Sequence, residues 1–122
     1  MTYREIDVSP FAHLPLAPHR VGTKPDLRWL KVDSLIVDDG YRRPIGRAGI
    51  ADVRCIAAEF RWEKFFVVVV APTSDGRFAI IDGQRRVTAA AVRGIQEVPC
   101  LVLRLSKAEQ ASMHRSGRKC RK

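Results

Sequence analysis

The chain has 122 residues, of which 46 % are hydrophobic, and its formal net charge is +9. This length and composition suit one small domain with a packed core, flanked by tails. No apolar run reaches the roughly 18 residues that span a bilayer, and the first residues lack the apolar segment of a signal peptide. We therefore expect a cytoplasmic protein that has no membrane partner.

Residues 1–26 are predicted to form an extended arm. They contain four prolines and show no sustained hydrophobic periodicity. Proline fixes φ and donates no backbone hydrogen bond, so this composition disfavours a helix or a central strand. Phe11, Leu14 and Leu16 are the candidates for docking the arm onto the domain.

The domain is predicted to begin with a strand over residues 27–37, where apolar and polar side chains alternate. Asp38-Asp39-Gly40 predicts a turn. Residues 41–44, Tyr-Arg-Arg-Pro, are expected to run extended, because a residue that precedes proline disfavours the α region.

A helix and a β-hairpin are predicted next. Residues 47–60 have helical spacing, and the side chains expected on the buried face are Ile50, Val53, Ile56, Ala57 and Phe60. Residues 65–71 form a β-branched and aromatic run, which predicts a strand buried on both faces. Residues 72–76 turn the chain, and residues 77–81 return as the partner strand.

Residues 84–93 predict the following helix, with Gly94 at its C-terminal cap. Its inward side chains are expected to be Val87, Ala90 and Ala91. A strand over residues 100–105 leads to a capping box, in which Ser106 and Glu109 open a last helix of one or two turns. We place the domain at residues 27–113.

Residues 114–122 form a basic tail. Five of the 22 lysines and arginines lie in its last eight residues, which contain no acid, so over half of the net charge of +9 arises there. These five residues are Arg115, Arg118, Lys119, Arg121 and Lys122. Such a tail favours a polyanionic partner such as DNA, and the alternative is a tail that only aids solubility.

The strongest functional signal is the segment 81–90, where a predicted strand turns at Gly83 into a helix. Backbone N–H groups at a helix start have no partner within the helix, and such starts bind phosphates. Arg85 and Arg86 add planar forks of donors that match phosphate oxygens. We predict a phosphate site here. The alternative role of the two arginines is an ion pair with a nearby aspartate: Asp38, Asp39 or Asp82.

Other polar residues give weaker signals. Asp82 is predicted to cap the following helix or to help hold a metal, and Gln84 and Thr88 are candidates for phosphate or base contacts, with solvent exposure as the alternative. The three cysteines have no paired Cys or His spacing, which speaks against a zinc site, and Cys55 and Cys100 are expected to be buried. No metal site and no catalytic residue is assigned from the sequence.

The order of these elements resembles the ParB/sulfiredoxin-like domain of partition proteins and of many phage proteins. The resemblance covers about residues 27–113 and implies an α+β fold, with a small mixed sheet flanked by helices. Its strongest piece is Asp-Gly-Gln-Arg-Arg at 82–86, followed by Ala89-Ala90, Gly94-Ile95 and Val98-Pro99. Residues 41–44 match an upstream arginine box, which implies that Arg43, with Arg42 beside it, contacts the nucleotide. Residues 61–65 resemble the linker of phage and actinobacterial members.

Members of this family use the motif in different ways. Partition proteins carry Gly-Glu-Arg-Arg and bind CTP with Mg²⁺, whereas sulfiredoxins have a catalytic cysteine in the motif and use ATP. Gln84 stands at the position of that glutamate and that cysteine. An amide is no thiolate nucleophile, so sulfiredoxin activity is not expected. It is also no carboxylate base or strong Mg²⁺ ligand, which speaks against hydrolysis and leaves binding intact.

The resemblance thus implies a nucleotide-binding, DNA-associated accessory module of a phage or mobile element. CTP or ATP with Mg²⁺ are the cofactor candidates. The residues expected at the phosphates are Gly83, Gln84, Arg85 and Arg86, with Arg43 and Arg42 closing from the other side. Two alternatives stay open: an enzyme of the same fold, such as a nuclease, an NTPase or a small-molecule kinase, and a non-catalytic interaction domain with a vestigial pocket.

Overall fold

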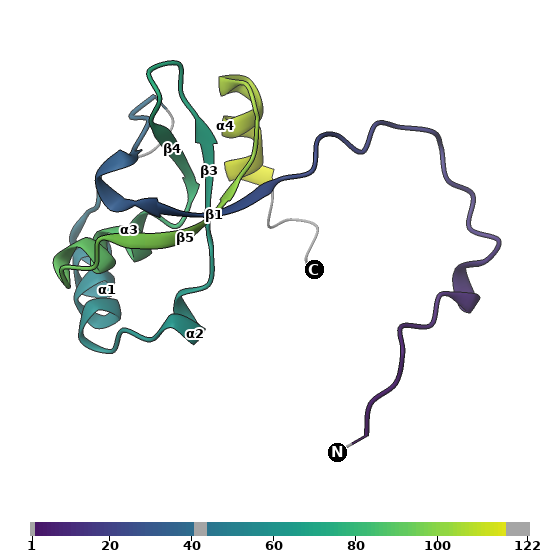
Figure 1. The fold of residues 1–122 in the computed structure, drawn as a ribbon, viewed down its shortest axis with the longest axis horizontal. Helices are drawn as coiled ribbons and strands as arrows, with labels where there is room; N and C mark the ends of the chain where they lie inside the picture. Colours follow the sequence, from purple (N-terminus) through teal and green to yellow (C-terminus); the bar gives the residue numbers. More distant parts are fainter. Residues whose placement is uncertain (1, 41–43, 117–122) are drawn as a thin grey trace.

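Five strands form one mixed sheet in the computed structural model, which describes residues 2–40 and 44–116 (Figure 1). The strands are β1 (Asp26–Lys31), β2 (Leu35–Ile36), β3 (Val68–Pro72), β4 (Phe78–Asp82) and β5 (Glu97–Val102). Their order in the sheet is β1-β5-β3-β4-β2. β3 pairs antiparallel with β4 and parallel with β5, so the end of β4 lies beside the beginning of β3. Val69 and Asp82 are register partners there.

The predicted strand over 27–37 is wrong as a single element. The chain breaks at a 3-10 turn, Val32–Ser34, where the Ser34 hydroxyl donates to the Lys31 carbonyl at 2.7 Å. β1 then lies antiparallel to β5 at one edge of the sheet, and β2 lies parallel to β4 at the other edge. The apolar alternation continues across the break, which is why periodicity does not reveal it.

The helices of the described chain are α1 (Arg47–Ala58), α2 (Trp62–Phe65), α3 (Gln84–Val92) and α4 (Lys107–Ser116). α1 packs against α3, and α4 contacts β4 (Figure 1). The core lies between the sheet and α2 and α3, and its buried members are Leu30, Phe65, Val68, Val70, Ile80, Val87, Ala90, Val98, Cys100 and Val102. Burial raises the pKa of the Cys100 thiol to about 11, so this cysteine is an inert core residue.

Of the eight side chains expected on the inward helix faces, three are buried, three are half-buried and two are exposed. Val53, Val87 and Ala90 are buried as predicted, whereas Ile50 and Ala91 are exposed. Ala89 is fully buried instead, because α3 is covered by α1 as well as by the sheet. The predictions for the cysteines divide in the same way: Cys100 is buried, but Cys55 is exposed on α1.

The hairpin prediction is confirmed, with a later start. β3 begins at Val68 and not at residue 65, because residues 62–65 form α2. From Val68 onward the strand is largely buried on both faces, as predicted. β5 begins at Glu97, earlier than predicted, and Pro99 pairs only with β1, since pairing with β3 starts at Cys100.

The predicted C-terminal cap of α3 and the predicted capping box of α4 are both confirmed. Gly94 has φ +83° at the end of α3, and the N–H groups of Gly94 and Ile95 donate to Ala91 and Ala90 at 3.0 and 2.9 Å. At the start of α4, the Ser106 N–H donates to Glu109 Oε1 at 2.9 Å, and the Glu109 N–H donates to Ser106 Oγ at 3.2 Å. α4 has ten residues, which is longer than predicted.

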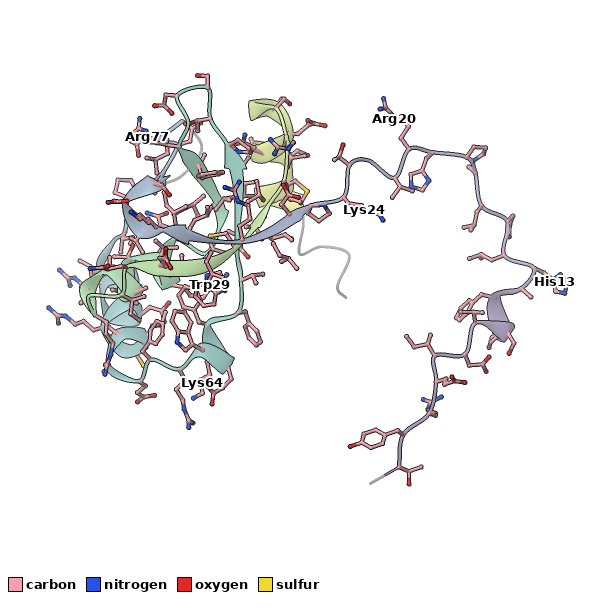
Figure 2. All side chains as sticks on the ribbon, viewed as in Figure 1. His13, Arg20, Lys24, Trp29, Lys64 and Arg77 are labelled. Atoms are coloured by element: carbon pink, nitrogen blue, oxygen red, sulfur yellow. The ribbon has the colours of Figure 1, made fainter. Side chains whose placement is uncertain are left out.

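The N-terminal arm is extended as predicted, apart from a short 3-10 turn at Ser9–Phe11. The three candidates for docking it, Phe11, Leu14 and Leu16, are exposed and do not dock the arm. Figure 2 shows the arm, with His13 and Arg20 on it, reaching away from the domain. Within the described chain, no helix is both long enough and apolar enough to cross a membrane.

Candidate functional site

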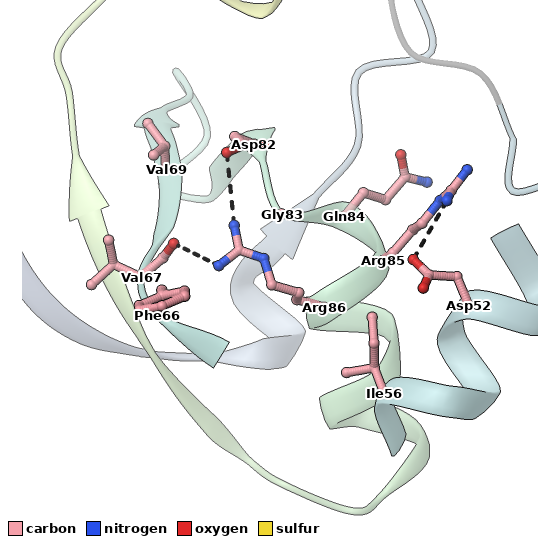
Figure 3. A pocket seen from close by; sticks show the side chains of 10 residues that line it. All are labelled: Asp52, Ile56, Phe66, Val67, Val69, Asp82, Gly83, Gln84, Arg85 and Arg86. Carbon is pink, nitrogen blue, oxygen red and sulfur yellow. Dashed lines mark hydrogen bonds and ion pairs between the residues drawn. The ribbon is translucent and has the colours of Figure 1, made fainter. Parts of the chain in front are cut away.

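A pocket of about 880 Å³ opens where β4 ends and α3 begins (Figure 3). This volume lies within the range of roughly 300–1,000 Å³ that is usual for small-molecule sites. α1, the approach to β3 and the segment 82–86 together provide its walls. The lining residues are Asp52, Ile56, Phe66, Val67, Val69, Asp82, Gly83, Gln84, Arg85 and Arg86. The pocket thus collects four of the residues that the sequence predicts at the phosphates.

Gly83 makes the turn into α3 and is its N-cap residue, with φ +114° and ψ 17°. A Cβ atom at this position would lie 3.1 Å from Arg86 Nη2 and 3.3 Å from Val68 Cγ1. Both the backbone angle and the close packing therefore require glycine. The first N–H groups of α3 have no acceptor within the helix and form its positive end, at the pocket wall.

Arg85 points from α3 toward α1, where its Nη1 lies 3.4 Å from Asp52 Oδ2 (Figure 3). The side chain is 52 % exposed, so this long ion pair contributes little to stability. Gly49 of α1 is buried beside it, and a Cβ atom there would lie 3.3 Å from Arg85 Nε. Gly49 and Asp52, which sequence reasoning missed, therefore position the Arg85 guanidinium at the rim of the pocket.

Arg86 has different partners, although it is the next residue. Its Nη1 donates to the backbone carbonyl of Phe65 and to that of Val67, the latter at 3.1 Å. Its Nη2 lies 3.7 Å from Asp82 Oδ2, and its guanidinium carbon lies 5.7 Å from the centre of the Phe65 ring. With a side chain only 22 % exposed, Arg86 mainly binds the segment 65–67 to α3.

The remaining candidate residues are placed as follows. The predicted capping role of Asp82 needs correction, because Gly83 occupies the N-cap position and Asp82 precedes it. Thr88 donates from its hydroxyl to the Gln84 carbonyl at 2.8 Å, so it serves its own helix, whereas Gln84 lines the pocket. The ion-pair alternative is realised between Arg86 and Asp82, whereas Arg85 pairs with Asp52, which was not among the predicted partners. Among the described residues, no group of three or more His, Cys, Asp or Glu side chains could hold a metal.

The other predicted site residues lie outside the described part of the chain. Arg42 and Arg43 fall in residues 41–43, and the four basic residues Arg118, Lys119, Arg121 and Lys122 fall in residues 117–122. Arg115 belongs to α4, but its side chain is outside the described part as well. Their predicted contacts with nucleotide and nucleic acid stay predictions.

Replacing Asp52 by asparagine is expected to tighten the binding of inorganic tripolyphosphate about two- to fivefold, measured by calorimetry at low salt without a divalent cation. The change removes a negative charge from the pocket wall and releases Arg85 from its ion pair. The gain should shrink as salt is added. Asp33→Asn, which changes the net charge equally but lies outside the pocket, is the control. Equal gains in both variants would contradict a local effect.

Comparison with known proteins identifies the fold. Residues 65–116 match the family model of the ParB N-terminal domain, and this match includes the Gly83 turn and both arginines. No relative of the chain was found among curated proteins. The fold is ParB-like, as the resemblance implies.

Three solved structures illustrate this similarity. C-terminally truncated ParB from Caulobacter crescentus complexed with CTP-gamma-S has a TM-score of 0.66 and 22 % identity, over 80 % of this chain and 54 % of that chain. The same partition protein complexed to the centromeric parS site has a TM-score of 0.59 and 22 % identity, over 71 % and 44 %. Protein Atu1540 from Agrobacterium tumefaciens has a TM-score of 0.52 and 21 % identity, over 77 % and 50 %. The chain thus spans about half the length of these proteins.

Proposed function

We propose that this chain is a ParB-like nucleotide-binding module that holds the phosphates of a nucleoside triphosphate at the Gly83 turn. The observation that carries the proposal is the convergence of the α3 start and the Arg85 guanidinium on one pocket. CTP is the first candidate, because a protein of similar fold has been crystallised with a CTP analogue. ATP is the second candidate.

The chemistry of the wall explains how a triphosphate would be held. Phosphate oxygens accept hydrogen bonds from the first N–H groups of α3. The half-exposed guanidinium of Arg85 leaves its ion pair with Asp52 and donates to a phosphate instead. Arg43 and Arg42 are proposed to close the site from the other side.

A Mg²⁺ ion would complete this arrangement. Asp52 and Asp82 put two carboxylates on the pocket wall, and their negative charge disfavours a triphosphate when no cation is bound. Mg²⁺ is usually held by one or two carboxylates together with substrate phosphates, and this donor set fits that pattern. Asp82, beside the Gly83 turn, is the residue proposed to face the ion, which when bound neutralises phosphate charge.

The direct test is a calorimetric titration of the protein with CTP, ATP, GTP and inorganic tripolyphosphate, each with and without Mg²⁺. We expect saturable binding of the nucleoside triphosphates that Mg²⁺ strengthens, with CTP binding tightest. Tripolyphosphate should bind as well, because the proposed anchor is the phosphate chain. The absence of saturable binding for all four compounds would overturn the proposal.

We also propose that the module associates with DNA. The net charge of +9 supports this, and a partition protein of similar fold has been crystallised with its parS site. Binding through the basic tail should fall steeply with salt and disappear when residues 115–122 are deleted. Binding that survives both changes would place the DNA contact elsewhere.

A further inference from the structure

Phe66, directly before β3, has a backbone conformation that is unusual for a bulky residue. Its φ is 60° and its ψ is −157°, and it is the one non-glycine residue with positive φ in the described chain. This region is disfavoured for residues with a Cβ atom, so the conformation costs free energy. The side chain of Phe66 is also 70 % exposed, whereas the preceding Phe65 is 2 % exposed in the core.

The contacts of Arg86 hold this conformation. Its Nη1 donates to the carbonyls of Phe65 and Val67, which flank Phe66 on both sides. The Phe66 N–H donates to the Trp62 carbonyl at 3.4 Å, at the end of α2. Between these anchors Phe65 lies buried in the core, whereas Phe66 is exposed and lines the pocket (Figure 3).

Stability does not account for this arrangement. An exposed phenylalanine forgoes the gain from apolar burial, and glycine would adopt the same φ without strain. The position of the ring does account for it, because Phe66 lines the same pocket as Gly83, Gln84 and Arg85. An exposed aromatic ring beside a phosphate site provides the flat apolar surface on which a nucleotide base stacks.

We propose that the base of the bound nucleotide stacks on Phe66, and that Arg86 is a positioning residue that holds this ring at the pocket. This inference rests on the proposed nucleotide site. It gives the two arginines different roles: Arg85 binds the phosphates, and Arg86 positions the Phe66 ring on which the base stacks. Because every base has a flat face, stacking separates nucleotides from inorganic tripolyphosphate and leaves the choice among bases to other contacts.

The experiment compares CTP with tripolyphosphate by calorimetry in wild type, Phe66→Leu and Phe66→Trp. Phe66→Leu should weaken CTP binding roughly 5- to 100-fold, the range for loss of one stacked base, and leave tripolyphosphate binding within about twofold. Phe66→Trp keeps a ring and should keep the preference for CTP. Phe11→Leu, which removes an exposed ring from the arm, is the matched control and should change neither affinity.

The outcomes separate this inference from the proposed function. If both ligands bind wild type and Phe66→Leu leaves their affinity ratio unchanged, the stacking role is overturned and the phosphate site stands. If tripolyphosphate binds wild type as tightly as CTP, the stacking role is likewise overturned. If neither these two ligands nor ATP or GTP binds, the proposed function is overturned together with the inference.

Two further variants test the positioning role. Arg86→Gln should weaken CTP binding by about the same factor as Phe66→Leu. The double variant, Arg86→Gln with Phe66→Leu, should weaken it little further, because both changes remove the same stacking contact. Phe66→Gly relieves the positive φ and lacks the ring, so it should unfold at the same or a higher temperature than Phe66→Ala while losing CTP affinity equally. Additive losses in the double variant, or a Phe66→Gly that melts below Phe66→Ala, would overturn the positioning role.

Discussion

Replacing Arg85 by alanine is expected to weaken CTP binding about 10- to 100-fold and to leave thermal stability almost unchanged. The guanidinium is half exposed and lies 3.4 Å from Asp52, so its loss costs the fold about 1 kcal/mol at most. A charge-assisted hydrogen bond to phosphate contributes roughly 1.5–3 kcal/mol, which sets the expected loss of affinity. Calorimetry measures the affinity, and a thermal melt measures the stability of the same sample.

Two variants make this result interpretable. Arg54→Ala removes an equal charge from an exposed position of α1 that does not line the pocket, and it should leave the affinity within about twofold. Arg85→Lys keeps the charge without the planar fork and should give an intermediate loss. If Arg54→Ala weakened binding as much as Arg85→Ala, general attraction to a basic protein would explain the binding. A double alanine at 85 and 86 is less informative, because it also releases the segment 65–67.

Elements with local causes could be predicted from the sequence. The β3–β4 hairpin, the Gly94 end of α3 and the capping box of Ser106 and Glu109 each depend on neighbouring residues, and each is confirmed. The Gly83 turn between strand and helix also lies where the motif predicts it. Features of this kind are determined by φ, by capping and by short-range hydrogen bonds, which a single sequence displays directly.

Other features depend on partners that are remote in the sequence. β1 and β2 follow one another along the chain, yet they pair at opposite edges of the sheet with β5 and β4. The same limit applies to the pocket, where Asp52 and Phe66 come from separate segments and carry no motif. Composition and periodicity cannot show which segments meet, so these residues were missed.

The two motif arginines illustrate the difference most clearly. In the sequence they are equivalent neighbours, and both are predicted at the phosphates. Successive residues of an α-helix point about 100° apart, so Arg85 is directed to α1 and Arg86 to the segment before β3. Their different contacts follow from what each helix face meets, and only the fold supplies that information.

Replacing Gly83 by alanine is expected to lower the free energy of unfolding by about 2–4 kcal/mol, a large effect for one methyl group. Two costs add at this position. A residue with a Cβ atom is strained at φ +114°, and the new methyl group would press on Arg86 Nη2 at 3.1 Å and on Val68 Cγ1 at 3.3 Å. Val68 is fully buried in β3, so it has little room to move. Urea denaturation measures the change.

Two other glycines separate these costs. Gly94, at the opposite end of α3, and Gly76, in the hairpin turn, have φ +83° and +87°, and a Cβ atom at either position would meet nothing within 4 Å. Gly94→Ala and Gly76→Ala should therefore show the backbone cost alone, about 1 kcal/mol each. The excess at Gly83 measures how tightly the turn packs on Arg86 and Val68. A Gly83→Ala variant no less stable than these two would contradict the predicted clash with Arg86 and Val68.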